Sequence, residues 1–199
     1  LEELKAVTLA DVKKFHDEFY GASHGEFVVV GEVDQAAVKK LAAELLGDWN
    51  APGSYARLAS PYKKAEAINK KIETPDKENA QFEAGMRIRL SEKDADYPAM
   101  VLANYMFGGS ITARMPNRIR NREGLSYGAS SRFTAPTDGD AGLFSATVSC
   151  NPVNMPKVEA SFVDELTKTL REGFTAAEVA AAKRAYADAR KVARSQEGT

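Results

Sequence analysis

The amino-acid sequence predicts an α+β fold in which helices pack on one face of a largely antiparallel sheet. One observation is the order of the elements: a strand is followed by helices, a hairpin and further helices, whereas a βαβ nucleotide-binding fold would alternate single strands with single helices. The other is composition, since the 199 residues are 44% apolar and 28% charged, which is typical of a globular chain with a sizeable core.

The first fifty residues predict a helix, a strand and a second helix. A helix over 8–19 begins at Thr8, which has an acidic residue three positions on as a capping-box partner. The apolar run 27–30 predicts a strand, and Asp34 caps a helix that Gly47 ends. A single strand cannot pair with itself, so we expect its sheet partners elsewhere in the chain or in an absent part.

A stretch with several prolines and a glycine predicts a linker over 51–66. Pro52 and Pro61 interrupt both helical and strand periodicity. We therefore expect a boundary between a helix–strand–helix unit at 1–50 and a separate domain over 67–199.

Three predicted elements follow the linker. Residues 80–90 alternate apolar and polar side chains with a period of two, which predicts a strand with one buried face. Residues 99–107 are apolar nearly all round and predict a buried helix that two glycines end. Residues 112–122 predict a short helical stretch that Gly124 ends.

A hairpin and two helices complete the pattern. The strands predicted over 127–135 and 143–150 flank a turn-forming Pro-Thr-Asp-Gly-Asp segment. A helix is predicted over 156–173, and Thr175 with Glu178 forms a capping box for a last, alanine-rich helix.

Charge and cysteine content exclude several classes of function. The 27 Lys+Arg against 28 Asp+Glu give no general attraction to nucleic acid or anionic membrane, and we expect no nucleic-acid partner. No apolar run approaches the roughly 20 residues of a membrane span. Cys150 is the single cysteine and cannot form an intramolecular disulfide. Because Leu1 is not a methionine, we expect the chain to be a piece of a longer protein.

No self-sufficient catalytic apparatus is visible in the sequence. The two histidines, His16 and His24, belong to neither H-E-x-x-H nor H-x-x-E-H, the spacings that place two imidazoles on one helical face. G-x-S-x-G is absent, and we interpret Cys150 as a small core residue. We therefore predict no metal ligand and no catalytic residue on this chain, which alone should be inactive.

Two further patterns have structural interpretations. The glycine-rich run 107–110 follows a helix rather than a strand and lacks the phosphate-loop lysine, so we interpret it as a helix end and tight turn. Arg114, Arg118 and Arg122 fall on one helical face while Arg120 points elsewhere. We interpret that face as solvated, because a nucleic-acid surface would need interleaved aromatic side chains.

The stretch from Gly108 to Tyr127 resembles the second-domain motif of the pitrilysin/insulinase family of zinc metallopeptidases, which includes the mitochondrial processing peptidases. The family pattern is a glycine-rich turn, S-x-R-L, then L-R-E-x-x-G-L-A-Y, and the spacing matches without a gap. Asn121 stands where the family usually has Glu, and Pro116 lies inside the helix start. The residues that carry the resemblance are Gly108, Gly109, Ser110, Arg114, Met115, Ile119, Arg120, Gly124, Leu125, Ser126 and Tyr127.

The resemblance extends over nearly the whole chain, from the segment 4–33 to the late G-x-T-x-x-E at 173–178. It implies a metallohydrolase-like fold of the processing peptidase type. Residues 1–50 would then be the tail of a preceding domain, whose earlier strands would pair with the orphan strand. Residues 67–199 would be the second, non-catalytic domain, which we expect to be truncated at its C-terminus.

The resemblance also implies roles for individual residues. The zinc and its H-x-x-E-H ligands would lie in a missing catalytic domain or a partner subunit, while Arg120 and Tyr127 would hydrogen-bond the substrate backbone near the scissile carbonyl. These side chains suit that role, since an arginine donates to carbonyls and a phenol stabilises an oxyanion. The alternative is that Arg120 pairs with a carboxylate and Tyr127 packs in the hairpin. The supporting loop residues would be Gly108, Gly109, Ser110 and Gly124.

The sequence therefore favours the non-catalytic, substrate-binding half of a zinc endopeptidase that degrades peptides or unfolded chains. One alternative is a scaffold or assembly subunit of the same family without peptidase activity, and another is a peptide-binding module acting alone. Bacterial extracytoplasmic members are common in the family, so the resemblance favours a periplasmic location.

Overall fold

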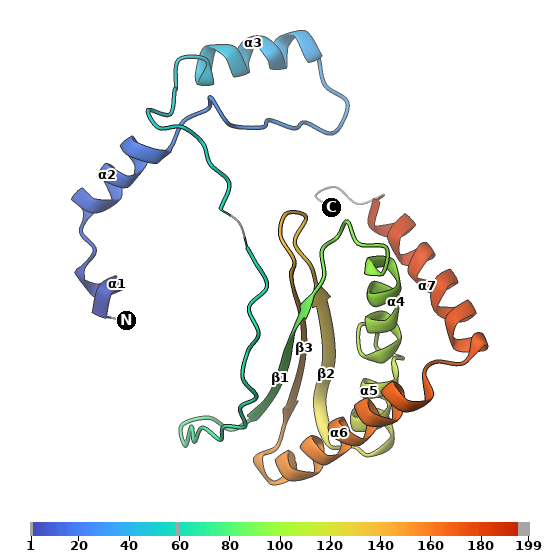
Figure 1. Cartoon of the computed structure of the whole chain (residues 1–199). Coiled ribbons are helices and arrows are strands. Elements are labelled where there is room, and N and C mark those ends of the chain that lie inside the picture. Colours follow the sequence, from blue (N-terminus) through green and yellow to red (C-terminus); the bar gives the residue numbers. More distant parts are fainter. Residues whose placement is uncertain (1, 59, 195–199) are drawn as a thin grey trace. The chain divides into compact units, whose positions relative to one another are not determined.

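The computed structural model describes residues 2–58 and 60–194 (Figure 1). Their contacts divide the chain into two compact units, with the division between Leu58 and Ala59. The predicted division into 1–50, 51–66 and 67–199 stays a prediction.

The first unit contains the helices α1 (Glu2–Ala6), α2 (Leu9–Phe19) and α3 (Gln35–Leu46). Reciprocal hydrogen bonds between Thr8 and Asp11 form the predicted capping box of α2. The carboxylate of Asp34 accepts hydrogen bonds from the next turn of backbone and caps α3. Both predicted helices are confirmed, whereas α1 has no counterpart in the sequence prediction.

The predicted strand over 27–30 is wrong for the described structure. These residues form no helix or strand and lie exposed, with Val30 93% accessible. A strand exists through backbone hydrogen bonds to a neighbouring strand, and the described residues of the first unit supply no such neighbour. An apolar sequence alone therefore did not produce a strand here.

The second unit is built on a three-stranded antiparallel sheet of β1 (Ala80–Arg89), β2 (Ser126–Thr134) and β3 (Ala141–Cys150). The strand order is β1-β3-β2, so β2 is an edge strand, and β1 pairs with β3 without interruption. The helices lie on one face of the sheet (Figure 1), which confirms the α+β prediction. They are α4 (Tyr97–Phe107), α5 (Arg114–Pro116), η1 (Asn117–Arg122), a short turn η2 (Pro152–Asn154), α6 (Met155–Glu172) and α7 (Ala176–Arg194).

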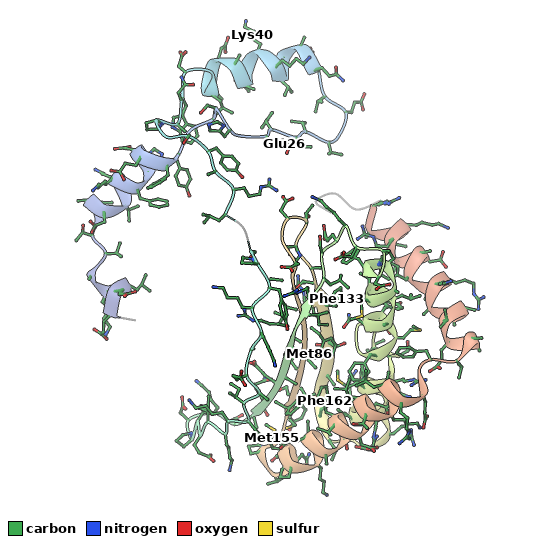
Figure 2. All side chains as sticks on the ribbon, in the orientation of Figure 1. Glu26, Lys40, Met86, Phe133, Met155 and Phe162 are labelled. Carbon is green, nitrogen blue, oxygen red and sulfur yellow. The ribbon has the colours of Figure 1, made fainter. Side chains whose placement is uncertain are left out.

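The core lies between the sheet and this helical layer. Phe162 of α6 packs its ring 5.1 Å from Phe82 on β1 and 6.2 Å from Phe107 at the end of α4, and Figure 2 shows it against the strands. Cys150 is fully buried, as predicted, and burial raises the pKa of its thiol. The other fully buried large side chains are Met115, Ile119, Val148, Val158 and Pro116. Within the described chain, no helix combines the length and apolar character of a membrane span.

Candidate functional site

The segment between α4 and β2 differs from the predicted single helix over 112–122. It begins with α5 at Arg114 and continues as η1, a π-helical turn over Asn117–Arg122. Met115 and Ile119 are completely buried and attach the segment to the core. A π-helical turn is rare and is frequently found at functional sites.

Arg114 connects this segment to α7. Its guanidinium donates two hydrogen bonds of 2.8 Å to the carboxylate of Glu178, in a bidentate pair. It also stacks on the ring of Phe174, with 4.6 Å between the guanidinium carbon and the ring centre. The pair lowers the pKa of Glu178 to about 2, and Thr175 contributes further hydrogen bonds to that carboxylate. Two segments that carried the family resemblance therefore contact each other here.

Arg118 is bound by three carboxylates. It donates to Glu123, to Asp164 and to Glu165 of α6, so η1 is held against that helix. The hydrogen bond from Arg118 lowers the pKa of Asp164. The side chains of Arg114 and Arg118 are only 20% and 22% exposed. The prediction of a solvated arginine face is therefore wrong for these two residues, because the carboxylates that pair with them come from distant elements.

Arg120 has different surroundings from its neighbours. It is exposed, and among the described residues it forms no hydrogen bond and no ion pair. It lines an open pocket of about 280 Å³ beside β2. The sequence left open that Arg120 pairs with a carboxylate. Among the described residues, no carboxylate pairs with it. The other lining residues are Gly108, Gly109, Ser110, Ile111, Pro116, Gly128, Ala129 and Ser130.

Tyr127 lies at a β-bulge at the start of β2. Ser126 pairs with Cys150 and Gly128 pairs with Ser149, so Tyr127 is the extra residue between two consecutive partners. Its side chain is 65% exposed. Tyr127 does not line the pocket of Arg120, but the next residue, Gly128, does. Bulges commonly redirect a side chain next to an active site.

The loop after α4 is shaped by close contacts. A Cβ atom on Gly108 would come within 2.5 Å of the Ser131 hydroxyl, and one on Gly109 would come within 2.9 Å of the Tyr105 backbone. Gly124 lies outside the pocket and adopts a φ of +64°, a left-handed conformation that favours glycine, where the chain turns from η1 into β2. Three predicted loop residues, Gly108 to Ser110, thus line the pocket with Arg120, and the fourth shapes the turn.

Two supporting residues were missed by the sequence reasoning. The Ser131 hydroxyl donates to the Asn104 side-chain oxygen at 2.8 Å, and the Ser131 N–H donates to the Gly108 carbonyl at 2.9 Å. These bonds fix the glycine loop to β2. The available signal was Asn104 itself, a polar residue in a helix that is otherwise apolar nearly all round.

The described residues do not fit a zinc site. No group of three or more His, Cys, Asp or Glu side chains among them could hold a metal ion. His16 instead stacks with Tyr20 and Trp49, with ring centres 5.5 and 5.8 Å apart. No chemical step is therefore assigned to a metal on this part of the chain.

Fold and site together define an α+β domain whose described residues present hydrogen-bond donors in an open pocket and hold no cluster of metal ligands. The chain belongs to the peptidase M16 inactive domain family, whose model matches residues 6–186. This family assignment confirms the resemblance to zinc metallopeptidases that the motifs indicated.

Relatives and solved structures agree with the assignment. A protein of Streptomyces coelicolor named as an uncharacterized zinc protease is 26% identical and covers 90% of this chain, and one of Mycobacterium tuberculosis is 23% identical and covers 92%. The chain spans 39% and 41% of their lengths. The peptidase M16 inactive domain from Pseudomonas fluorescens has the same fold, with a TM-score of 0.79 at 24% identity over 96% of this chain and 45% of that one. A Helicobacter pylori protease follows, with a TM-score of 0.76 at 21% identity over 96% of this chain and 46% of that one.

Proposed function

We propose that this chain is the non-catalytic, substrate-binding half of a zinc-dependent endopeptidase. It would work with a zinc-bearing catalytic domain, in the same polypeptide or in a partner subunit, on peptides or unfolded chains. The observation that carries the proposal is Arg120, which is exposed at a pocket and unpaired within the described structure, while Arg114 and Arg118 of the same segment are bound by carboxylates. An unpaired guanidinium at a pocket is available to donate to a ligand.

The edge of β2 supports peptide binding at this place. The N–H of Ser131 points away from β3, because it donates to the Gly108 carbonyl. Ala129, two residues earlier, therefore also directs its backbone groups outward, and no described backbone group pairs with them. An extended peptide can hydrogen-bond to such an edge, with Arg120 beside it. Tyr127, exposed at the bulge, would donate its phenol hydroxyl to the scissile carbonyl as negative charge develops there.

Kinetics of Arg120→Gln and Tyr127→Phe in the full-length enzyme, together with its catalytic partner, test the proposal. Loss of a donor to a developing oxyanion lowers kcat by about 10²–10³-fold, so we expect Tyr127→Phe to lower kcat/KM for peptide cleavage substantially. Arg122→Gln is the matched control, since Arg122 is an exposed arginine on the same turn that does not line the pocket.

Two outcomes would contradict the proposal. If both variants cleave peptides as fast as the wild type, the residues do not support catalysis. If the wild-type protein with zinc and its partner cleaves no peptide at all, the scaffold alternative is favoured.

A further inference from the structure

We propose that the pocket of Arg120 takes a carboxylate of the bound peptide, so that peptides with a carboxylate at this position are the preferred substrates. This inference rests on the proposed function and specifies its substrate class. The carboxylate belongs either to an aspartate or glutamate side chain or to the C-terminus of the peptide. Both present the same chemistry to the pocket, and the experiment below separates them.

The pocket carries a single charge, and that charge is positive. Arg120 is the only charged residue among those that line it, and the polar side chains beside it are the hydroxyls of Ser110 and Ser130. A pocket with one cation and no carboxylate attracts anions and disfavours lysine or arginine side chains.

The acidic residues of the surrounding segment do not neutralise Arg120. Glu123, three residues away, accepts hydrogen bonds from Arg118 and from the Ser161 hydroxyl. Arg118 also binds the nearby carboxylates of α6, Asp164 and Glu165. The positive charge of Arg120 is therefore not cancelled by an ion pair within the described structure.

Several hydrogen-bond donors at the pocket are unpaired within the described structure. The Gly108 carbonyl is occupied by the N–H of Ser131. In contrast, the N–H groups of Ser110 and Ile111 have no hydrogen-bond partner among the described residues. Arg120 adds the planar donor fork that matches a carboxylate in a bidentate manner. Unpaired backbone N–H groups next to a guanidinium are a combination that binds anions.

The size and place of the pocket suit one side chain of a peptide. Its volume of about 280 Å³ lies below the range of roughly 300–1,000 Å³ typical of sites for whole small molecules. Ala129 lines it and also directs its backbone toward the open edge of β2. In a peptide that binds along a strand edge, the backbone supplies affinity and alternate side chains enter pockets that supply specificity.

Matched peptides test this inference on the full-length enzyme with its catalytic partner. One set places Glu or Gln at each position flanking the cleaved bond in turn, and a second set compares free with amidated C-termini. We expect one Glu/Gln pair, or the free/amidated pair, to differ by about tenfold in kcat/KM, since charge-assisted hydrogen bonds are among the stronger polar contacts. A difference within a Glu/Gln pair identifies a side chain as the source of the carboxylate. A difference within the free/amidated pair identifies the peptide C-terminus.

Variants connect any preference to the pocket. Arg120→Gln should abolish the preference, Arg120→Lys should keep part of it, and the control Arg122→Gln should keep all of it. Equal kcat/KM within every pair, or a preference that survives in Arg120→Gln, would overturn the inference. If Arg120→Gln lowers kcat/KM equally for both members of every Glu/Gln pair and of the free/amidated pair, the proposed function holds and the carboxylate inference fails. If neither Arg120→Gln nor Tyr127→Phe changes any rate, the proposed function fails as well.

Discussion

Neighbouring arginines in one short segment have opposite roles, and their partners decide which role each has. Arg114 pairs with Glu178 of α7, and Arg118 pairs with Asp164 of α6. These carboxylates are far away in the sequence. Arg120, between them and β2, has no such partner in the described structure and borders the pocket. The ion pairs of Arg114 and Arg118 thus hold in place the turn that carries Arg120.

The Arg114–Glu178 pair makes stability depend on pH. The hydrogen bond from Arg114 lowers the pKa of Glu178 from 4.5 to about 2, so the pair stabilises the fold fully above about pH 4.5. This stabilisation is lost as the pH falls from about 4.5 toward 2, because the unfolded chain takes up the proton first. We expect urea unfolding to show that loss in the wild type and a smaller one in Glu178→Gln.

Arg114→Met serves as the second half of that comparison. It removes the largest cause of the lowered pKa of Glu178 and leaves the hydrogen bonds from Thr175, so its stability should decline less over the same pH range than that of the wild type. An equal decline in all three proteins would show that other carboxylates dominate acid unfolding.

Gly108 is predicted to tolerate no side chain. The Cβ of Gly108→Ala would lie 2.5 Å from the Ser131 hydroxyl and 2.9 Å from the Met115 side chain, so the loop or β2 must shift. Overpacking of this kind costs about 1–3 kcal/mol, measurable as a lower urea midpoint. Gly128→Ala is the control, because a Cβ there meets nothing within 4 Å. Equal stability of Gly108→Ala and wild type would contradict the described contact.

At the scale of helices and strands, the features that could be predicted from the sequence are those that local interactions determine. The capping boxes at Thr8 and Thr175 and the strand over Ala80–Arg89 depend on side chains a few residues apart, and the structure contains them. The motif also placed Arg120 and the glycine loop in one short stretch. The π-helical turn, the bulge at Tyr127 and the bond between Asn104 and Ser131 depend on packing between distant elements, which periodicity does not encode.

The failed strand over 27–30 leads to a prediction about hydrogen exchange. Amides of β3 are paired with strands on both sides, whereas those of 27–30 have no strand partner in the described residues. In the 199-residue chain we expect 27–30 to exchange at nearly the unfolded rate and β3 to be slower by at least about 10³-fold. Comparable protection in the two segments would show that the first unit forms a sheet that the structure lacks.

At the scale of the whole molecule, the proposed function makes the chain one part of a larger enzyme. It spans about two fifths of the length of its zinc protease relatives, and its family is that of the inactive domain. The described residues supply donors and a shaped pocket, while the metal chemistry is proposed to reside in another domain or subunit. The relatives named above are bacterial, and a periplasmic location stays a prediction.

Peptide binding by the metal-free, full-length protein tests the central claim most directly, because it separates substrate binding from zinc chemistry. After zinc is removed with a chelator, fluorescence anisotropy of a labelled acidic peptide reports affinity without cleavage. We predict that the metal-free protein still binds the peptide, that Arg120→Gln raises Kd by about tenfold, and that Arg122→Gln leaves Kd unchanged. Binding that disappears with the zinc, or that is the same in wild type and Arg120→Gln, would contradict the account.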